Sequence, residues 1–169
     1  MGSALPDYVR ALPRVFLREG EMVFTSRQLV VQTVLGSCVS VIMRDAESGL
    51  SAMCHAAMPN APQWETESLR YVDGAIDRII RRFKSSGIDG KQLQVKLVGG
   101  ADLRVDHGGK HLEAVGTRNL QTAIAQLESR GLQVTASHSG GDSGRRVLFV
   151  TSTGEVFVHT LPHSFRNGR

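Results

Sequence analysis

The chain has 169 residues, of which 41% are hydrophobic and 21% are charged, and its formal net charge is +4. This length fits one domain with a substantial core, and the composition excludes a disordered chain. No window approaches the roughly 20 apolar residues of a membrane-spanning helix, and short, dispersed Lys/Arg pairs with few aromatic residues argue against nucleic-acid binding.

Taken in chain order, residues 1–15 contain Pro6 and Pro13 and are expected to form an irregular arm with about one helical turn. Three short apolar runs follow, and the alternating, β-branched pattern of the last one favours strands. Residues 45–49 have the composition of a turn, and the next apolar run is predicted to be the returning strand. The predicted strands are 21–24, 28–35, 38–44 and 50–58.

A helix is predicted after the polar stretch 59–68, because apolar residues recur at steps of three and four before Gly87. Its apolar face is formed by Leu69, Val72, Ile76, Ile79, Ile80 and Phe83. A second helix is expected over about residues 117–130, with Leu120, Ala123, Ile124 and Leu127 on one face.

The remaining apolar runs predict strands at 93–100, 132–138, 145–151 and 155–161, the last two forming a hairpin. Residues 106–111 are expected to be a loop tip, and 162–169 a flexible tail. This order predicts an α/β (α+β) fold: one domain over 1–169, a layered sandwich of largely antiparallel mixed β-sheet with two main helices.

Cys38 is the first candidate for chemistry, because it follows Gly36 and Ser37 at the start of a predicted strand. A turn of this kind can aim backbone N–H groups at a carbonyl oxygen, as an oxyanion hole requires. Most free cysteines are buried and inert, and packing is the interpretation adopted for Cys54. Without a visible secretory signal or a Cys-x-x-Cys pair, we expect free thiols in the cytoplasm and no metal site.

His55 lies in the next predicted strand, where a lone histidine is more often a hydrogen-bonded core residue than a catalyst. Closing the hairpin at residue 47 places Cys38 opposite residue 56, beside His55. A thiolate–imidazolium pair lowers the pKa of the thiol and supplies the base and acid for acyl transfer. A third group should orient the imidazole, and Thr33 is the nearby candidate. An ordinary structural role for Thr33, as a β-branched residue of a strand, is an equally good interpretation.

Three clusters of glycine, at 99–100, 108–109 and 140–144, match no phosphate-binding loop. Turns or bulges between strands explain them better. Some of these glycines are expected to line the surroundings of Cys38.

Several segments together resemble the CheD family, the chemoreceptor glutamine deamidases of bacterial and archaeal chemotaxis. The segments are TVLGSCVSV, AMCHAAMP, RYVDGAIDRII, KLVGGADL, GTRNLQTAI and SGGDSGRRVLFVTSTGEVFV, and the resemblance spans roughly residues 16–161. The run HAAMP departs from the family pattern, which has bulkier apolar residues after the histidine.

The resemblance implies a core fold like that of bacterial deamidating toxins and a cysteine-dependent amidohydrolase that needs no cofactor. By it, Cys38 is the nucleophile, His55 its base and Thr33 the third member of a triad. It also implies two partners: chemoreceptor cytoplasmic domains as substrate, and a CheC-type CheY-phosphatase as regulator.

Two other functions remain open at this point. The same residues suit a thiol protease or a transglutaminase-like acyl transferase, which would cleave a chain or incorporate an amine instead of releasing ammonia alone. A non-catalytic adaptor that binds chemoreceptors or CheC would use Cys38 only for packing.

Overall fold

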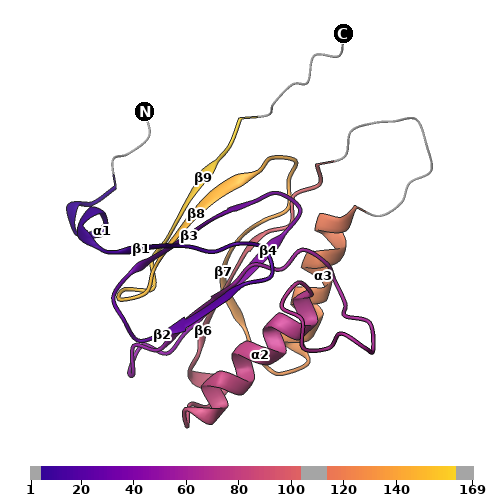
Figure 1. Ribbon diagram of the computed structural model, residues 1–169, viewed down its shortest axis with the longest axis horizontal. Coiled ribbons are helices and arrows are strands. Elements are labelled where there is room, and N and C mark those ends of the chain that lie inside the picture. Colours follow the sequence, from indigo (N-terminus) through magenta and orange to yellow (C-terminus); the bar gives the residue numbers. More distant parts are fainter. Residues whose placement is uncertain (1–4, 104–113, 163–169) are drawn as a thin grey trace.

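The computed structural model describes residues 5–103 and 114–162. The loop tip expected at 106–111 and all but the first residue of the expected tail lie outside these ranges. The described strands form two sheets instead of one (Figure 1). The four-stranded sheet has the order β1 (Arg14–Phe16), β3 (Val30–Leu35), β8 (Arg145–Val150) and β9 (Val156–Thr160). The five-stranded sheet has the order β2 (Met22–Thr25), β5 (Ser51–Cys54), β4 (Val39–Arg44), β6 (Gln94–Gly99) and β7 (Val134–Ser139).

Most neighbouring strands are antiparallel, and the pairs β1–β3 and β6–β7 are parallel. A mixed, largely antiparallel layered sandwich was therefore the correct prediction. The described helices are α1 (Asp7–Ala11), α2 (Val72–Ser85) and α3 (Val115–Glu128), with a 3₁₀ turn at Gly90–Gln92. The helical turn expected in the first fifteen residues is α1, whereas β1, which begins at Arg14 and pairs with β3, was not predicted.

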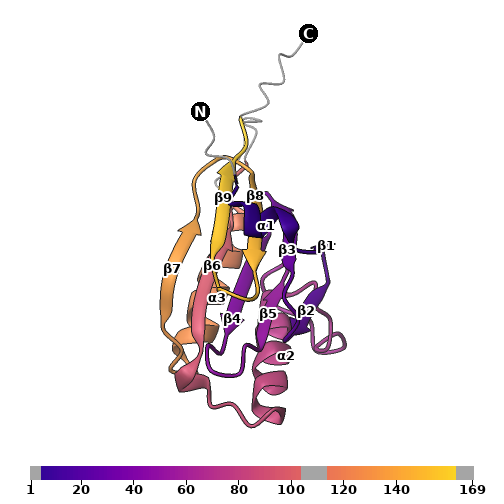
Figure 2. The ribbon, with the colours of Figure 1, turned by 90° about the vertical axis from the view of Figure 1, so that its left-hand side faces the viewer.

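The layers are built by alternation along the strands, because successive side chains point to opposite faces of a sheet. In β4, Val39, Val41 and Met43 pack toward α2 and α3, whereas Ile42 faces the four-stranded sheet. The inner core between the sheets also contains Val31 and Leu35 of β3. The short helix α1 covers part of the outer face of the four-stranded sheet through Val9. The molecule thus has four layers, and Figure 2 looks onto the broad face of the sheets, where the strands of the five-stranded sheet follow one another from β7 on the left to β2 on the right.

Both main helices occur where periodicity placed them. The apolar face of α2 is buried through Val72, Ile76, Ile79 and Phe83, as predicted. The face of α3 was assigned partly wrongly, because Ile124 is exposed and the buried residues are Gly116, Asn119, Ala123 and Leu127. A polar side chain, Asn119, therefore lies on the buried stripe of α3.

Candidate active site

The register of the hairpin between β4 and β5 brings Cys38 and His55 to the same face of the five-stranded sheet. Val39 pairs with Ala56 through two backbone hydrogen bonds of 2.9 Å. Cys38 therefore continues toward residue 57, and His55 lies opposite Ser40. The expected pairing of residue 38 with 56 was wrong by one position, a slip that would have put the two side chains on opposite faces. In the observed register they are diagonal neighbours on the face that meets the four-stranded sheet. The Cα atoms of such diagonal pairs on adjacent strands are typically about 7–8 Å apart.

Thr33 of β3 reaches His55 from the other sheet. The Thr33 Oγ1 lies 2.9 Å from His55 Nδ1 and donates to the Leu17 carbonyl at 2.7 Å. Because the single hydroxyl proton is used on Leu17, Thr33 Oγ1 must accept from His55, so Nδ1 carries the proton. The Leu17 carbonyl, 3.4 Å from Nδ1, requires the same tautomer since it can only accept. His55 Nε2 is then left as the basic nitrogen, which is the state needed to accept a proton from a thiol.

The titration behaviour of the pair differs from the thiolate–imidazolium pair expected from sequence. Burial, with a smaller contribution from the Glu19 carboxylate, raises the pKa of the half-buried Cys38 thiol from 9.0 to about 11. Burial lowers the pKa of His55 below its ordinary 6.5, although the Leu17 carbonyl, Glu19 and Glu21 oppose this change. Both side chains are therefore neutral at pH 7 to 8, and the proton moves to His55 only when the thiol attacks.

The backbone around Cys38 is fixed by hydrogen bonds that its carbonyl groups accept from the segment after β6. The carbonyl oxygens of Gly36 and Cys38 accept from Ala101 N–H at 2.9 Å and Gly100 N–H at 2.8 Å. Among the described residues, the N–H groups of Ser37 and Cys38 donate to no other backbone carbonyl. The N–H groups of Ser37 and Cys38 therefore join that of Gly36 as candidate oxyanion donors.

Gly99 confirms the expectation that a glycine lines the surroundings of the cysteine. Its φ is +109°, and a Cβ at this position would lie 2.3 Å from the Cys38 carbonyl oxygen. Only glycine permits this approach without moving the backbone of Cys38.

Three residues near this site were not identified from the sequence. Asn119 donates to the carbonyls of Ser37 and Ala57 at 2.9 and 3.0 Å. Ser40, opposite His55, has a buried hydroxyl with no hydrogen-bond partner. Glu19 lies in the segment that pairs with the backbone of His55 and forms an ion pair of 3.7 Å with Arg70. An Asn four and eight residues before the buried Ala123 and Leu127 is a signal that would have placed Asn119 on the inner stripe of its helix.

The other cysteine and the other histidines lie elsewhere or outside the described ranges. Cys54 points to the helix-facing side of the sheet, where it packs in the outer core, so it is separated from Cys38 by the sheet itself. His138 accepts from the guanidinium of Arg145, and His159 is exposed on β9. The remaining histidines, His107, His111 and His163, are outside the described residues.

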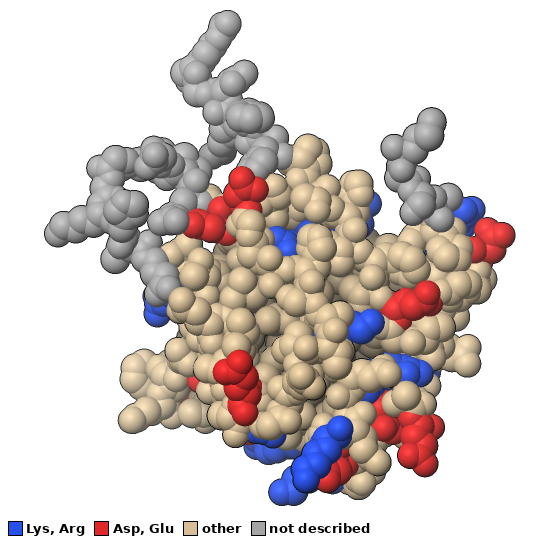
Figure 3. Space-filling model, turned by 180° about the vertical axis from the view of Figure 1, so that it is seen from behind, with Lys and Arg blue, Asp and Glu red and all other residues tan. Residues whose placement is uncertain are grey.

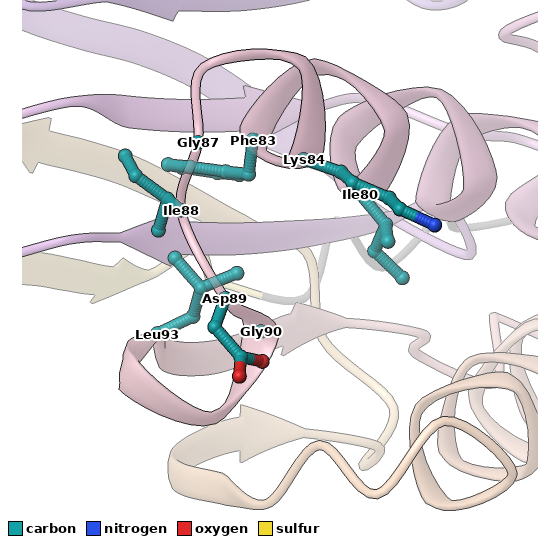
Figure 4. Close-up of a pocket in the computed structure, with 8 residues that line it drawn as sticks. All are labelled: Ile80, Phe83, Lys84, Gly87, Ile88, Asp89, Gly90 and Leu93. Atoms are coloured by element: carbon teal, nitrogen blue, oxygen red, sulfur yellow. The ribbon is translucent and has the colours of Figure 1, made fainter.

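An apolar pocket of about 470 Å³ lies beside the C-terminal end of α2 (Figure 4). Its lining includes Ile80, Phe83, Ile88 and Leu93. Because Gln94 pairs with Arg44 and Gly99 pairs with Val39, this pocket and Cys38 lie at opposite ends of β4. The pocket is therefore separate from the candidate site.

The face shown in Figure 3 carries acidic and basic side chains interspersed with larger uncharged areas. Within the described ranges, no helix has the length and apolar character needed to cross a membrane.

Comparisons with known proteins point to one family. The sequence model of the family described as CheD chemotactic sensory transduction matches residues 57–160, which begin just after His55. A protein of Geobacter sulfurreducens named probable chemoreceptor glutamine deamidase CheD 2 is 45% identical over 89% of this chain and 91% of its own length. A probable chemoreceptor glutamine deamidase CheD of Oleidesulfovibrio alaskensis is 39% identical over 89% of this chain and 74% of its own length. Among solved structures, YlmD of Geobacillus stearothermophilus gives a TM-score of 0.46 at 12% identity, covering 71% of this chain and 50% of that one.

Proposed function

This chain belongs to the CheD family, and we propose that it is a chemoreceptor glutamine deamidase in which Cys38 is the nucleophile, His55 the base and Thr33 the residue that orients the imidazole. The observation that carries the catalytic part is the pair of contacts from Thr33 to His55 and Leu17, because they leave Nε2 of His55 unprotonated on the face that Cys38 shares.

The reaction proceeds through a thioester. The Cys38 thiol gives its proton to His55 Nε2 as sulfur attacks the carboxamide carbon of a receptor glutamine, and the carbonyl oxygen becomes an oxyanion near Ser37 and Cys38 N–H. As the tetrahedral intermediate collapses, the C–N bond breaks and the imidazolium protonates the leaving ammonia. Water then attacks the thioester with His55 as base, the C–S bond breaks, and glutamate and the thiol are released.

The change in charge gives the reaction its signalling value. One neutral amide becomes one carboxylate on a receptor helix bundle, which biases a two-state receptor through local electrostatics. We also propose that a CheC-type CheY-phosphatase regulates this protein and that it acts in the cytoplasm. Membership of the CheD family supports both proposals.

The deciding experiment for this function is the intact mass of a chemoreceptor cytoplasmic fragment incubated with the protein. Each Gln→Glu conversion adds about one dalton in ordinary water and about three in ¹⁸O water, because water supplies the replacing hydroxyl. Ester hydrolysis would instead subtract about 14 daltons, and proteolysis or amine transfer would give fragments or larger additions. An unchanged mass on several receptor fragments that bind the protein would favour the adaptor function.

The pH dependence of kcat/KM follows from the two pKa shifts. Activity requires a neutral His55 and a protonated Cys38, so we expect an acid limb with its midpoint below pH 6.5 and a plateau that extends toward the Cys38 pKa of about 11. On the acid side activity falls because imidazolium cannot accept the thiol proton. Alkylation of Cys38 by iodoacetamide should rise with pH to a midpoint near 11. An alkylation rate already constant at pH 7 would show a preformed thiolate and contradict this account.

A further inference from the structure

We propose that Asn119 is a positioning residue of the reaction, which orients the peptide bond between Ser37 and Cys38 so that the Cys38 N–H faces the developing oxyanion. This inference rests on the proposed function, because it assigns a task to a residue that touches neither the nucleophile's sulfur nor the base. The geometry that carries it is the pair of hydrogen bonds from Asn119 Nδ2 to the carbonyls of Ser37 and Ala57.

The two chain segments that carry Cys38 and His55 are no longer joined by strand pairing next to these residues. Their regular pairing ends at Val39 and Ala56, immediately after Cys38 and immediately after His55 in the sequence. Beyond that pair, Met58 N–H turns away to the Arg70 carbonyl. The side chain of Asn119 spans the gap and joins Ser37 to Ala57 where the strands no longer join each other.

Fixing the Ser37 carbonyl also fixes the direction of the Cys38 N–H. The peptide unit is planar and trans, so its C=O and N–H point in opposite directions. Because the Ser37 carbonyl points to Asn119 on α3, the Cys38 N–H points away from α3. The Ala101 N–H holds the Gly36 carbonyl in the same way and thereby sets the Ser37 N–H. Two adjacent N–H groups are thus held by contacts to their own peptide carbonyls, the rigid donor arrangement that oxyanion stabilisation requires.

The burial of Asn119 argues against a merely space-filling role. The side chain is fully buried on a stripe otherwise formed by Gly116, Ala123 and Leu127. Both of its partners are carbonyls, which can only accept, so the amide orientation is determined and Oδ1 points elsewhere. Oδ1 is buried without a hydrogen-bond partner, which is unfavourable and would be avoided by an apolar residue here.

The docking of α3 places Asn119 within reach of the nucleophile. A Cβ on Gly116 would lie 2.1 Å from the Ala101 carbonyl oxygen, so the first turn of α3 rests directly on the backbone that follows β6. The same segment holds Gly36 and Cys38 through Ala101 and Gly100. The helix and the loop of the nucleophile are therefore positioned by one short stretch of chain.

The test compares Asn119→Ala and Asn119→Ser with wild type on a receptor fragment, and uses Leu127→Ala as the control. Leu127 is fully buried on the same stripe of α3 two turns away, so its truncation loosens the helix without touching Ser37. We expect Asn119→Ala to lower kcat roughly 10²-fold with a small change in KM, because the lost interaction acts in the transition state. Asn119→Ser keeps one donor, so we expect an intermediate loss of kcat and a smaller loss of stability than in Asn119→Ala.

The rate of Cys38 alkylation by iodoacetamide distinguishes a positioning role of Asn119 from a merely structural role. Alkylation forms no oxyanion, so its rate should stay within about threefold of wild type while kcat falls. An unchanged kcat in the Asn119 variants, an equal loss in Leu127→Ala, or alkylation that falls in parallel with kcat would each overturn the inference. If wild type itself releases no ammonia from any receptor fragment, the proposed function fails first and this assignment falls with it.

Discussion

Replacing Cys38 with alanine is expected to abolish deamidation of a chemoreceptor fragment. Without the sulfur no thioester forms, and the remaining groups can only assist direct attack by water. The loss of a nucleophile that works with a base as one unit is on the order of 10⁶-fold. The measurement is the rate of mass increase of the fragment, followed beside binding of the same fragment, which should persist because the change is small and local.

Cys54→Ala is the matched control for this variant. Cys54 is buried in the outer core on the opposite face of the same sheet. Its truncation should leave kcat unchanged and lower the free energy of unfolding by about 1 kcal/mol, as for a small deletion in a packed core. Deamidation that survives in Cys38→Ala, or that is lost in Cys54→Ala at full folding, would falsify the assignment of the nucleophile.

The register between β4 and β5 shows how far the sequence could be interpreted. Composition placed both strands and the turn between them, but not the centre of the turn. In the structure Arg44 pairs with Ser51, and the turn is closed by Asp45, whose carboxylate accepts from Ser48 N–H at 2.8 Å. Gly49 follows with φ of +75°. These local contacts move the pairing by one residue, and that residue decides whether Cys38 and His55 share a face.

The division into two sheets was beyond a sequence-based prediction for a different reason. Val30 pairs with Val150, so the partner of β3 lies more than a hundred residues away. Local periodicity identifies a strand and its buried face, whereas the choice of partner depends on long-range packing. The members of the proposed triad were chosen from sequence by residue type, but the contact between Thr33 and His55 depends on this choice of partner strand, since the two residues belong to different layers.

The direction of the thiol pKa also required the structure. A nearby imidazole suggested a lowered pKa, but burial dominates at both groups and favours their neutral forms. A neutral pair suits an enzyme that meets its substrate on another protein, because a neutral thiol is less exposed to oxidation and alkylation before the substrate arrives.

His55→Ala is expected to lower kcat by about 10⁵- to 10⁶-fold, nearly as much as loss of the nucleophile itself. With the Cys38 pKa at about 11, the thiol attacks slowly at neutral pH unless a base removes its proton. The double variant with Cys38→Ala should be no slower than either single variant, because the two residues act as one unit. The same mass assay measures all three, with thermal unfolding as the check on folding.

Thr33→Val separates the orientation of the imidazole from its chemistry. Valine has a similar shape and removes the acceptor 2.9 Å from His55 Nδ1, while the Leu17 carbonyl at 3.4 Å still favours the same tautomer. The expected loss in kcat is therefore about 10- to 100-fold, well short of that in His55→Ala, because the proton stays on the correct nitrogen and only its alignment weakens. Thr33→Ser keeps the hydroxyl and should recover most of the rate. A loss in Thr33→Val as large as in His55→Ala would mean that Leu17 cannot hold the tautomer, and that the hydrogen bond between the two sheets alone makes His55 a base.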